Sequence, residues 1–243
     1  WLSAGTFAHS TRSAARATMW AAARLFAIAS LPLLQTAEPV RTRQKLVFRG
    51  FPWRLAWRGF ISEAAVGFDV LASGTAWSLL VAVFILGVTA SNQVYAQLGA
   101  LISVVTLVAL LSSYAYGTLI DRRRGGELLR VTVLMNALTH MARPFATTPA
   151  MAIGVNVANE VATTGYSMAF TRGMFDTADL SGHRITYLGC MEVVVNAGAA
   201  LSGGTVLLLV TGMEPVDGLR NFFFVAAFIS LLIAIPKFRL YRK

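Results

Sequence analysis

The sequence has a single cysteine and few charged residues. Cys190 lies inside an apolar stretch, and one cysteine forms neither an intramolecular disulfide nor a paired-cysteine metal site. Only 13% of the 243 residues are charged and 56% are hydrophobic, whereas roughly a quarter of an ordinary soluble domain is charged. This composition excludes such a domain and indicates a membrane protein.

Motifs for several kinds of catalysis are also missing. There is no P-loop to indicate an ATP-driven pump, and no HExxH or paired Cys and His to form a metal site. Ser202 and His140 are residue types that an intramembrane serine protease uses, but nothing in the sequence places them on facing helices. We therefore expect no enzyme, no metal and no cofactor.

Acidic residues are scarce, with 11 Asp and Glu against 21 Lys and Arg, giving a formal net charge of +10. A strongly basic protein often binds nucleic acid, but that requires a soluble basic face. The basic residues here stand between long apolar runs. We expect the lipid bilayer, and no nucleic acid, as the partner of this charge.

Seven apolar runs approach the roughly 20 residues that a helix needs to cross a bilayer. They predict an all-α polytopic membrane protein of about seven transmembrane helices. The runs are Met19 to Gln35, Thr75 to Tyr95, Gln97 to Ile120, Leu128 to Phe145, Ala150 to Phe170, Ile185 to Val210 and Asn221 to Pro236. The stretch Gly59 to Ala72 alternates apolar residues with Glu63 and Asp69, which predicts an amphipathic helix at the interface.

Basic residues orient these spans, because cytoplasmic loops carry the excess of Lys and Arg. Threading the seven spans alternately puts most of the 21 basic residues on one side. That set is Arg41, Arg43, Lys45, Arg49, Arg54, Arg58, Arg122, Arg123, Arg124, Arg130, Arg172, Arg184, Lys237, Arg239, Arg242 and Lys243. We expect an integral protein of the inner or plasma membrane, with a cytoplasmic C-terminus. The chain starts at Trp1 with no signal peptide, so we also expect a fragment of a larger protein.

One loop carries a recognisable pattern, in the stretch YGTLIDRRRGGELLR from residue 116 to 130. Gly117 is followed four residues later by Asp121 and Arg122, then by Arg124 and Gly125. This resembles the loop signature of the major facilitator superfamily, which lies between the second and third spans of each six-helix half. The glycine stands one place later than in that family.

The resemblance implies a domain organisation and a mechanism. Residues 1–40 would be a polar lead and the last helix of a missing N-terminal half. Residues 41–72 would be the basic central cytoplasmic loop with its interfacial helix, and residues 73–243 the six-helix C-terminal bundle. The five signature residues would form a conformational latch, with Asp121 accepting hydrogen bonds from a neighbouring helix N-terminus. The simpler alternative is that the arginines only fix topology.

Three of the predicted spans carry a polar stripe on one helix face. The stripes are Thr132, Asn136, Thr139, His140 and Arg143; then Asn156, Asn159, Glu160, Thr163 and Ser167; and last Glu192, Asn196, Ala199 and Gly203. Such faces serve either helix contacts or a solvated cavity for substrate. For Asn136, Asn156 and Thr163 we favour helix contacts. The same applies to Gly198, Gly203 and Gly204, which allow close helix approach.

Glu160 and Glu192 are the strongest candidates for a proton or cation path. A carboxylate inside the bilayer is expected to be protonated or to pair with a cation, and His140 and Arg143 are possible partners. Arg143, near the outer surface, could instead extend its side chain to the water. Each glutamate could also make only a structural hydrogen bond. The candidate path comprises Glu160, Glu192, Asn156, Asn196, Asn136 and His140.

These features together predict a secondary active transporter of a small solute, working by alternating access, with protons or another cation as candidate coupling ions. Two alternatives stay open, a non-transporting membrane scaffold or partner-binding subunit, and a channel. The substrate is not evident from the sequence.

Overall fold

The computed structural model describes residues 20, 23, 24, 28, 46–85 and 92–241, and the side chains of 92–102 are outside this description. The chain divides into two compact units, Trp1–Lys45 and Leu46–Lys243. The first is described at four positions only, so the predicted span from Met19 to Gln35 lies almost wholly outside the described residues.

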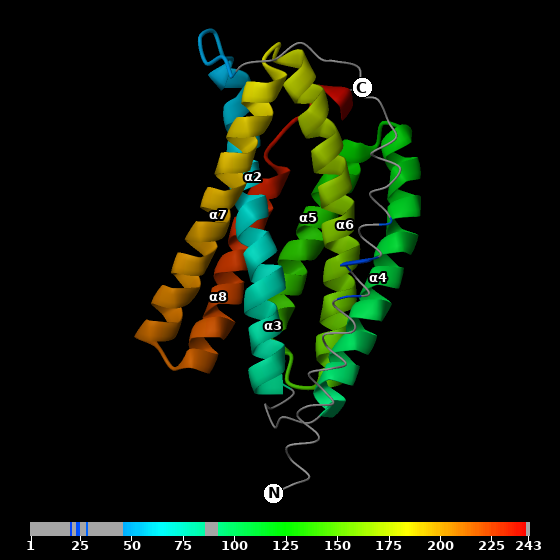
Figure 1. The fold of residues 1–243 in the computed structure, drawn as a ribbon, viewed down its shortest axis with the longest axis vertical. Helices are drawn as coiled ribbons and strands as arrows, with labels where there is room; N and C mark the ends of the chain where they lie inside the picture. Colours follow the sequence, from blue (N-terminus) through cyan, green and yellow to red (C-terminus); the bar gives the residue numbers. More distant parts are fainter. Residues whose placement is uncertain (1–19, 21–22, 25–27, 29–45, 86–91, 242–243) are drawn as a thin grey trace, which may run out of the picture. The chain divides into compact units, whose positions relative to one another are not determined.

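The second unit is a bundle of long helices (Figure 1), and no strand occurs in the part of the chain that the structure describes. The long helices run alternately up and down the bundle, with α3 continuing α2 in the same direction, so helix ends from distant parts of the sequence meet at each end of the bundle (Figure 1). The α-helices are α2 (Trp53–Leu71), α3 (Trp77–Leu80), α4 (Asn92–Asp121), α5 (Gly125–Ala142), α6 (Pro149–Leu180), α7 (Arg184–Gly212) and α8 (Pro215–Ser230).

The first of these helices corrects a prediction. A π-helical segment, Ala72–Ala76, joins α2 to α3, and a second, Val81–Ile85, follows α3, so one helix continues from Trp53 to Ile85. The stretch predicted to lie at the interface is instead part of a membrane-length helix in the bundle. The physical reason is that no proline follows Pro52 to stop the helix, and the acidic positions face other helices. Tyr95, predicted to end this span, belongs to α4.

Local sequence explains the other helix boundaries. The Thr148 side chain caps α6 by accepting a hydrogen bond from the Met151 amide at 3.3 Å, and Pro149 follows at the first helical position, where its missing N–H costs nothing. Pro215 opens α8 in the same way. Arg123, in the turn between α4 and α5, has a positive φ of 58°, which is uncommon for a residue with a side chain.

Two glycines allow α2 and α7 to pack with their backbones in contact. A Cβ on Gly67 would overlap the carbonyl oxygen of Val195, and one on Gly198 would overlap that of Ala64. The close-approach interpretation is therefore confirmed for Gly198. It is wrong for Gly203, where a Cβ would meet only Leu71 at 3.7 Å, and for Gly204, where it would meet nothing within 4 Å.

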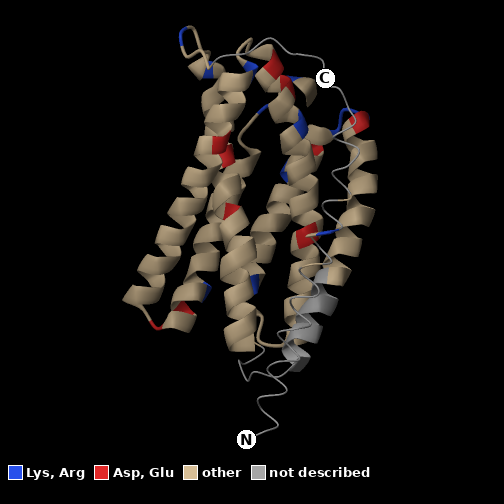
Figure 2. Cartoon of the chain, in the orientation of Figure 1, with Lys and Arg blue, Asp and Glu red and all other residues tan. Residues whose placement is uncertain are grey.

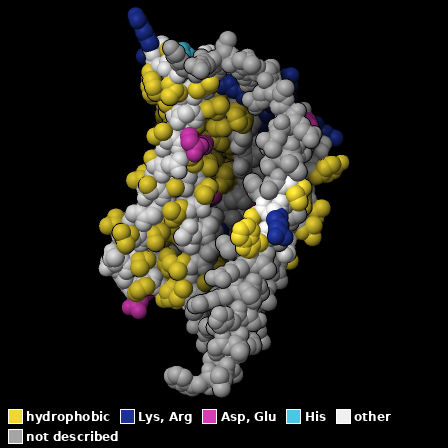
Figure 3. Space-filling view, viewed as in Figure 1, with side chains coloured by type: hydrophobic (Ala, Val, Ile, Leu, Met, Phe, Trp, Pro, Cys, Tyr) yellow, Lys and Arg dark blue, Asp and Glu magenta, His cyan; other side chains and the backbone are white. Residues whose placement is uncertain are grey.

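Four described helices are long and apolar enough to cross a membrane, which identifies the chain as an integral membrane protein. They are Trp53–Ile85, Ser103–Asp121, Arg184–Gly212 and Pro215–Ala234. Large apolar side chains are exposed on the bundle surface (Figure 3), as a lipid-facing surface requires. The prediction of seven spans goes further than these four. The helices α5 and α6 are not among the four, because their sequences contain more polar residues.

Charge is distributed unevenly along the bundle. Lys and Arg gather near the end formed by the starts of α2, α5 and α7 (Figure 2), and the end of α8 lies there too. Figure 2 also shows acidic positions part-way along α2, α6 and α7, where apolar surroundings make charge costly. These acidic positions define the candidate site.

Candidate functional site

The interior of the bundle holds a group of polar side chains, which we call the central polar cluster. It consists of Asp69 from α2, Asn136 and His140 from α5, Arg143 just after α5, and Tyr166 from α6. None of the five is more than 3% exposed. Polar groups buried this deeply need partners inside the protein, so their hydrogen bonds define the arrangement.

The Asp69 carboxylate is the acceptor at the centre of the cluster. Asn136 donates its side-chain N–H to Oδ1 at 2.7 Å, and His140 Nε2 lies 2.5 Å from the same oxygen. The Tyr166 hydroxyl donates to Oδ2 at 2.5 Å. Three donors from two other helices therefore replace the water that a carboxylate would otherwise bind.

The protonation of His140 follows from its two neighbours. Arg143 Nη1 lies 3.0 Å from His140 Nδ1, and a guanidinium has only N–H donors, so Nδ1 must accept. The proton is then on Nε2, which donates to Asp69. A neutral imidazole thus connects a carboxylate to a guanidinium, and the chain Asp69–His140–Arg143 carries no net charge.

The Arg143 guanidinium is held between aromatic rings. Its central carbon lies 5.0 Å from the centre of the Trp77 ring and 5.3 Å from that of Phe223, at which distance the ring faces attract the cation. Among the described residues, Nε and Nη2 have no hydrogen-bond partner. The idea that Arg143 extends to the outer surface is wrong, because it is 0% exposed.

The π-helical segment after α2 supplies further contacts to the cluster. Such segments insert a residue into a helix and often occur at functional sites. Ser73, inside this segment, accepts from Arg143 Nη1 at 3.2 Å and donates to Asn159 Oδ1 at 3.4 Å. Thr139 also donates to that oxygen, at 3.4 Å. The network therefore ties the first long helix to α5 and α6.

A second group of acidic side chains lies along α2 and α7. Glu63 of α2 is half-buried and interacts electrostatically with Glu192 of α7. One carboxylate oxygen of Glu63, Oε2, is buried without a hydrogen-bond partner among the described residues. Glu192 is exposed and accepts from the Asn196 side chain at 3.2 Å. We call Glu63, Glu192 and Asn196 the α2–α7 acidic face.

Glu160 stands apart from both groups, on α6. It is half-buried, receives a long hydrogen bond of 3.5 Å from Thr164, and interacts electrostatically with Tyr166 of the central polar cluster. Asn156, one turn earlier, is also half-buried. No described Lys, Arg or His forms a salt bridge with Glu63, Glu160 or Glu192.

The structure brings the predicted path residues together only in part. Asn136 and His140 meet in the central polar cluster, whereas Glu192 and Asn196 pair on α7, and Glu160 and Asn156 lie on α6. Of the cations expected to accompany the glutamates, His140 instead contacts Asp69, and Arg143 contacts His140. Asp69 and Tyr166 were absent from the predicted site. The uninterrupted helical sequence from Trp53 onward was the signal that could have placed Asp69 inside the membrane.

The residues of the predicted latch lie around the turn between α4 and α5. Asp121 ends α4 and is exposed, and its carboxylate makes no hydrogen bond or ion pair within the described part of the chain. Gly117 lies one turn earlier and, like Asp121, borders an open cleft of about 680 Å³ between α4 and α6. The predicted contact of Asp121 with a helix N-terminus is not formed in this structure, and it stays a prediction for a partner beyond these residues.

The remaining signature residues make local contacts. Arg122 is exposed, and Arg124 forms an ion pair with Glu127 at 2.7 Å. Gly125 opens α5 beneath the Tyr241 ring, which a Cβ at that position would overlap. Burial raises the pKa of Tyr241 to about 12, so its hydroxyl stays protonated and donates to the Ala169 carbonyl at 2.8 Å.

Comparisons with models of protein families, with curated proteins and with solved structures found no match to this chain. No group of three or more His, Cys, Asp or Glu residues suited to a metal ion occurs in the described ranges. The site therefore contains one carboxylate with a described basic partner, Asp69, and three without a described salt bridge, Glu63, Glu160 and Glu192.

Proposed function

We propose that the chain is the C-terminal half of a secondary transporter of the major facilitator type. In this proposal the described bundle works with an N-terminal half that lies outside this sequence, and a small solute crosses between the two by alternating access. The helix bundle, the loop signature at Asp121 and the basic end of the bundle support it. The basic end, with the C-terminus, faces the cytoplasm of an inner or plasma membrane.

The observation that carries the proposal is the presence of three carboxylates that form no salt bridge within the part of the chain that the structure describes. Glu63, Glu160 and Glu192 lie on helices of the bundle. Among the described residues, the buried basic side chains are engaged elsewhere, because His140 contacts Asp69 and Arg143 contacts His140. A carboxylate left unpaired among apolar helices is costly, and such residues mark ion or substrate pathways. We assign Glu160 the coupling role, because it is half-buried and interacts electrostatically with Tyr166 of the cluster.

Uptake into proteoliposomes containing the complete transporter, N-terminal half included, tests the proposal. The parent should show saturable uptake and counterflow, driven by an imposed pH gradient. Glu160→Gln should abolish pH-driven accumulation and keep solute exchange, since exchange needs no net proton movement. Glu214→Gln is the matched control, because Glu214 is exposed in the short loop before α8.

Two results would contradict the proposal. Flux that rises linearly with solute concentration and shows no counterflow would indicate a channel. Absence of flux for every solute class tried, together with stable capture of a partner protein by the same bundle, would indicate a scaffold. If Glu160→Gln still accumulates solute as the parent does, transport stands but Glu160 is not the coupling site.

A further inference from the structure

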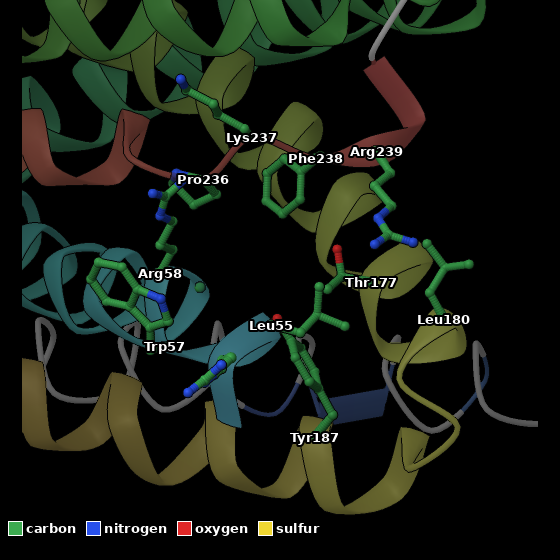
Figure 4. Close-up of a pocket in the computed structure, with 12 residues that line it drawn as sticks. Leu55, Trp57, Arg58, Thr177, Leu180, Tyr187, Pro236, Lys237, Phe238 and Arg239 are labelled. Atoms are coloured by element: carbon green, nitrogen blue, oxygen red, sulfur yellow. The ribbon is translucent and has the colours of Figure 1, made fainter. Parts of the chain in front are cut away.

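The basic end of the bundle contains a pocket that the proposed transport path does not use (Figure 4). Its walls come from the start of α2, the end of α6, the start of α7 and the segment after α8. The cavity has a volume of about 270 Å³. It brings together residues from four parts of the sequence, which no local pattern would have joined.

Four cationic side chains line this pocket. Arg54 and Arg58 come from α2, and Lys237 and Arg239 come from the C-terminal segment. No acidic residue is among the lining residues, and no salt bridge joins any of the four to a described carboxylate. The nearby Asp179 already pairs with Arg184 at 2.7 Å. The pocket therefore has an uncompensated positive charge.

The start of α2 adds to this positive potential. The helix begins at Trp53, so Arg54 stands in its first turn, where the helix dipole is positive. The Trp53 and Leu55 amides already donate to the carbonyls of Phe51 and Pro52 at 2.9 Å, so the contribution of this helix end is its dipole. Anions are favoured at such a position, and here side-chain cations surround it.

Aromatic residues indicate the depth of the pocket in the membrane. Trp57 lines it, and both Trp53 and Trp57 are exposed at this end of the bundle, as tryptophans are at the level of lipid headgroups. The Arg58 guanidinium lies 5.3 Å from the centre of the Trp57 ring. Leu55, Leu180 and Phe238 provide apolar walls between the cations. The pocket thus combines charge and apolar surface at headgroup depth.

We propose that this pocket binds a phosphate group, presented by the headgroup of an anionic phospholipid. Phosphate oxygens accept paired N–H bonds from arginine, and basic pockets between helices on the cytoplasmic side suit lipid phosphates. A bound phosphate would connect the start of α2 to the segment after α8. This role is independent of which solute, if any, the bundle carries.

Binding is tested on the purified chain in detergent, with short-chain phosphatidic acid, short-chain phosphatidylcholine and inorganic phosphate as separate ligands. The double variant Arg58→Gln with Lys237→Gln removes two pocket cations. Arg122→Gln with Arg123→Gln is the matched control, because it removes two exposed cations from the same end of the bundle without touching the pocket. Dissociation constants come from native mass spectrometry or from ligand-dependent thermal shifts.

We expect phosphatidic acid to bind the parent saturably and phosphatidylcholine to bind much more weakly. The pocket variant should lose roughly 30-fold in affinity, given the usual contribution of each headgroup-level cation, while the control stays within about twofold. Inorganic phosphate binding as tightly as phosphatidic acid, with the same variant pattern, would keep the phosphate site and replace the lipid by free phosphate. Equal losses in both double variants, or no saturation, would overturn the pocket and leave only surface charge.

Discussion

The two acidic regions of this bundle deal with charge in opposite ways. In the central polar cluster, Asp69 is 2% exposed and receives three hydrogen bonds, and its charge is balanced through His140 by Arg143. On the α2–α7 acidic face, Glu63 and Glu192 repel each other, and no described cation forms a salt bridge with either. Full burial therefore goes with a balanced charge, whereas partial exposure goes with carboxylates that have no described cation.

This difference separates a role in holding helices from a role in binding. Breaking the Asp69–His140–Arg143 chain leaves a charge in the interior, so the helices that carry it are expected to move together. An uncompensated carboxylate near the surface of the bundle can instead take up a proton or a cation with little rearrangement. We therefore expect the central polar cluster to hold the helices together, and the α2–α7 acidic face, like Glu160, to be able to bind a proton or a cation.

Removing the cation from the central polar cluster should have the largest effect. Arg143→Met leaves the Asp69 carboxylate buried without its counter-charge, and we expect a loss of about 3–5 kcal/mol in the free energy of unfolding. Denaturant unfolding in mixed micelles measures it. Arg220→Met is the control, because Arg220 is partly exposed and lies 3.8 Å from Asp217, a geometry worth about 0–1 kcal/mol. Equal effects of the two variants would show that burial does not separate the regions.

An intermediate effect is expected where α2 and α7 touch. Gly198→Ala places a Cβ against the Ala64 carbonyl, and the resulting shift of the helices should cost about 1–3 kcal/mol. Gly204→Ala, six residues along the same helix, meets nothing within 4 Å and should be neutral or stabilise by up to about 1 kcal/mol. Thermal unfolding of both variants in detergent decides the matter. Loss of stability in Gly204→Ala as large as in Gly198→Ala would contradict the close approach.

The smallest effect should come from neutralising the acidic face. Glu63→Gln removes a charge that has no described cation partner. The free energy of unfolding should therefore fall by no more than about 0.5 kcal/mol, or rise slightly. The same replacement at Asp69, as Asp69→Asn, should destabilise much more, because three donors there require a carboxylate. Comparable losses in Glu63→Gln and Asp69→Asn would remove the distinction between the two regions.

The positions of several helices along the chain could be predicted from the sequence, whereas the side-chain contacts between helices could not. The span from Ile185 to Val210 matches α7 within one or two residues at each end, because hydropathy and the glycine at its end are local signals. The stretch around Asp69 was assigned to the membrane surface, because an acidic residue in an apolar stretch suggests amphipathicity whether it faces water or a cation. Only the position of His140, 71 residues further along the chain, distinguishes these cases.

The sequence by itself determined that this is a helical membrane protein with a strongly basic set of loops, because bilayer length and hydropathy act on each segment separately. The tertiary structure decided which charged side chains pair with one another. Arg143 contacts His140 inside the bundle, whereas Glu63 Oε2 has no described hydrogen-bond partner. In the sequence, both are single charged residues within apolar runs. Packing also places Arg54 and Arg239, which are far apart in the sequence, at one pocket. Electrostatic energy depends on distances across the bundle, and only packing sets those distances.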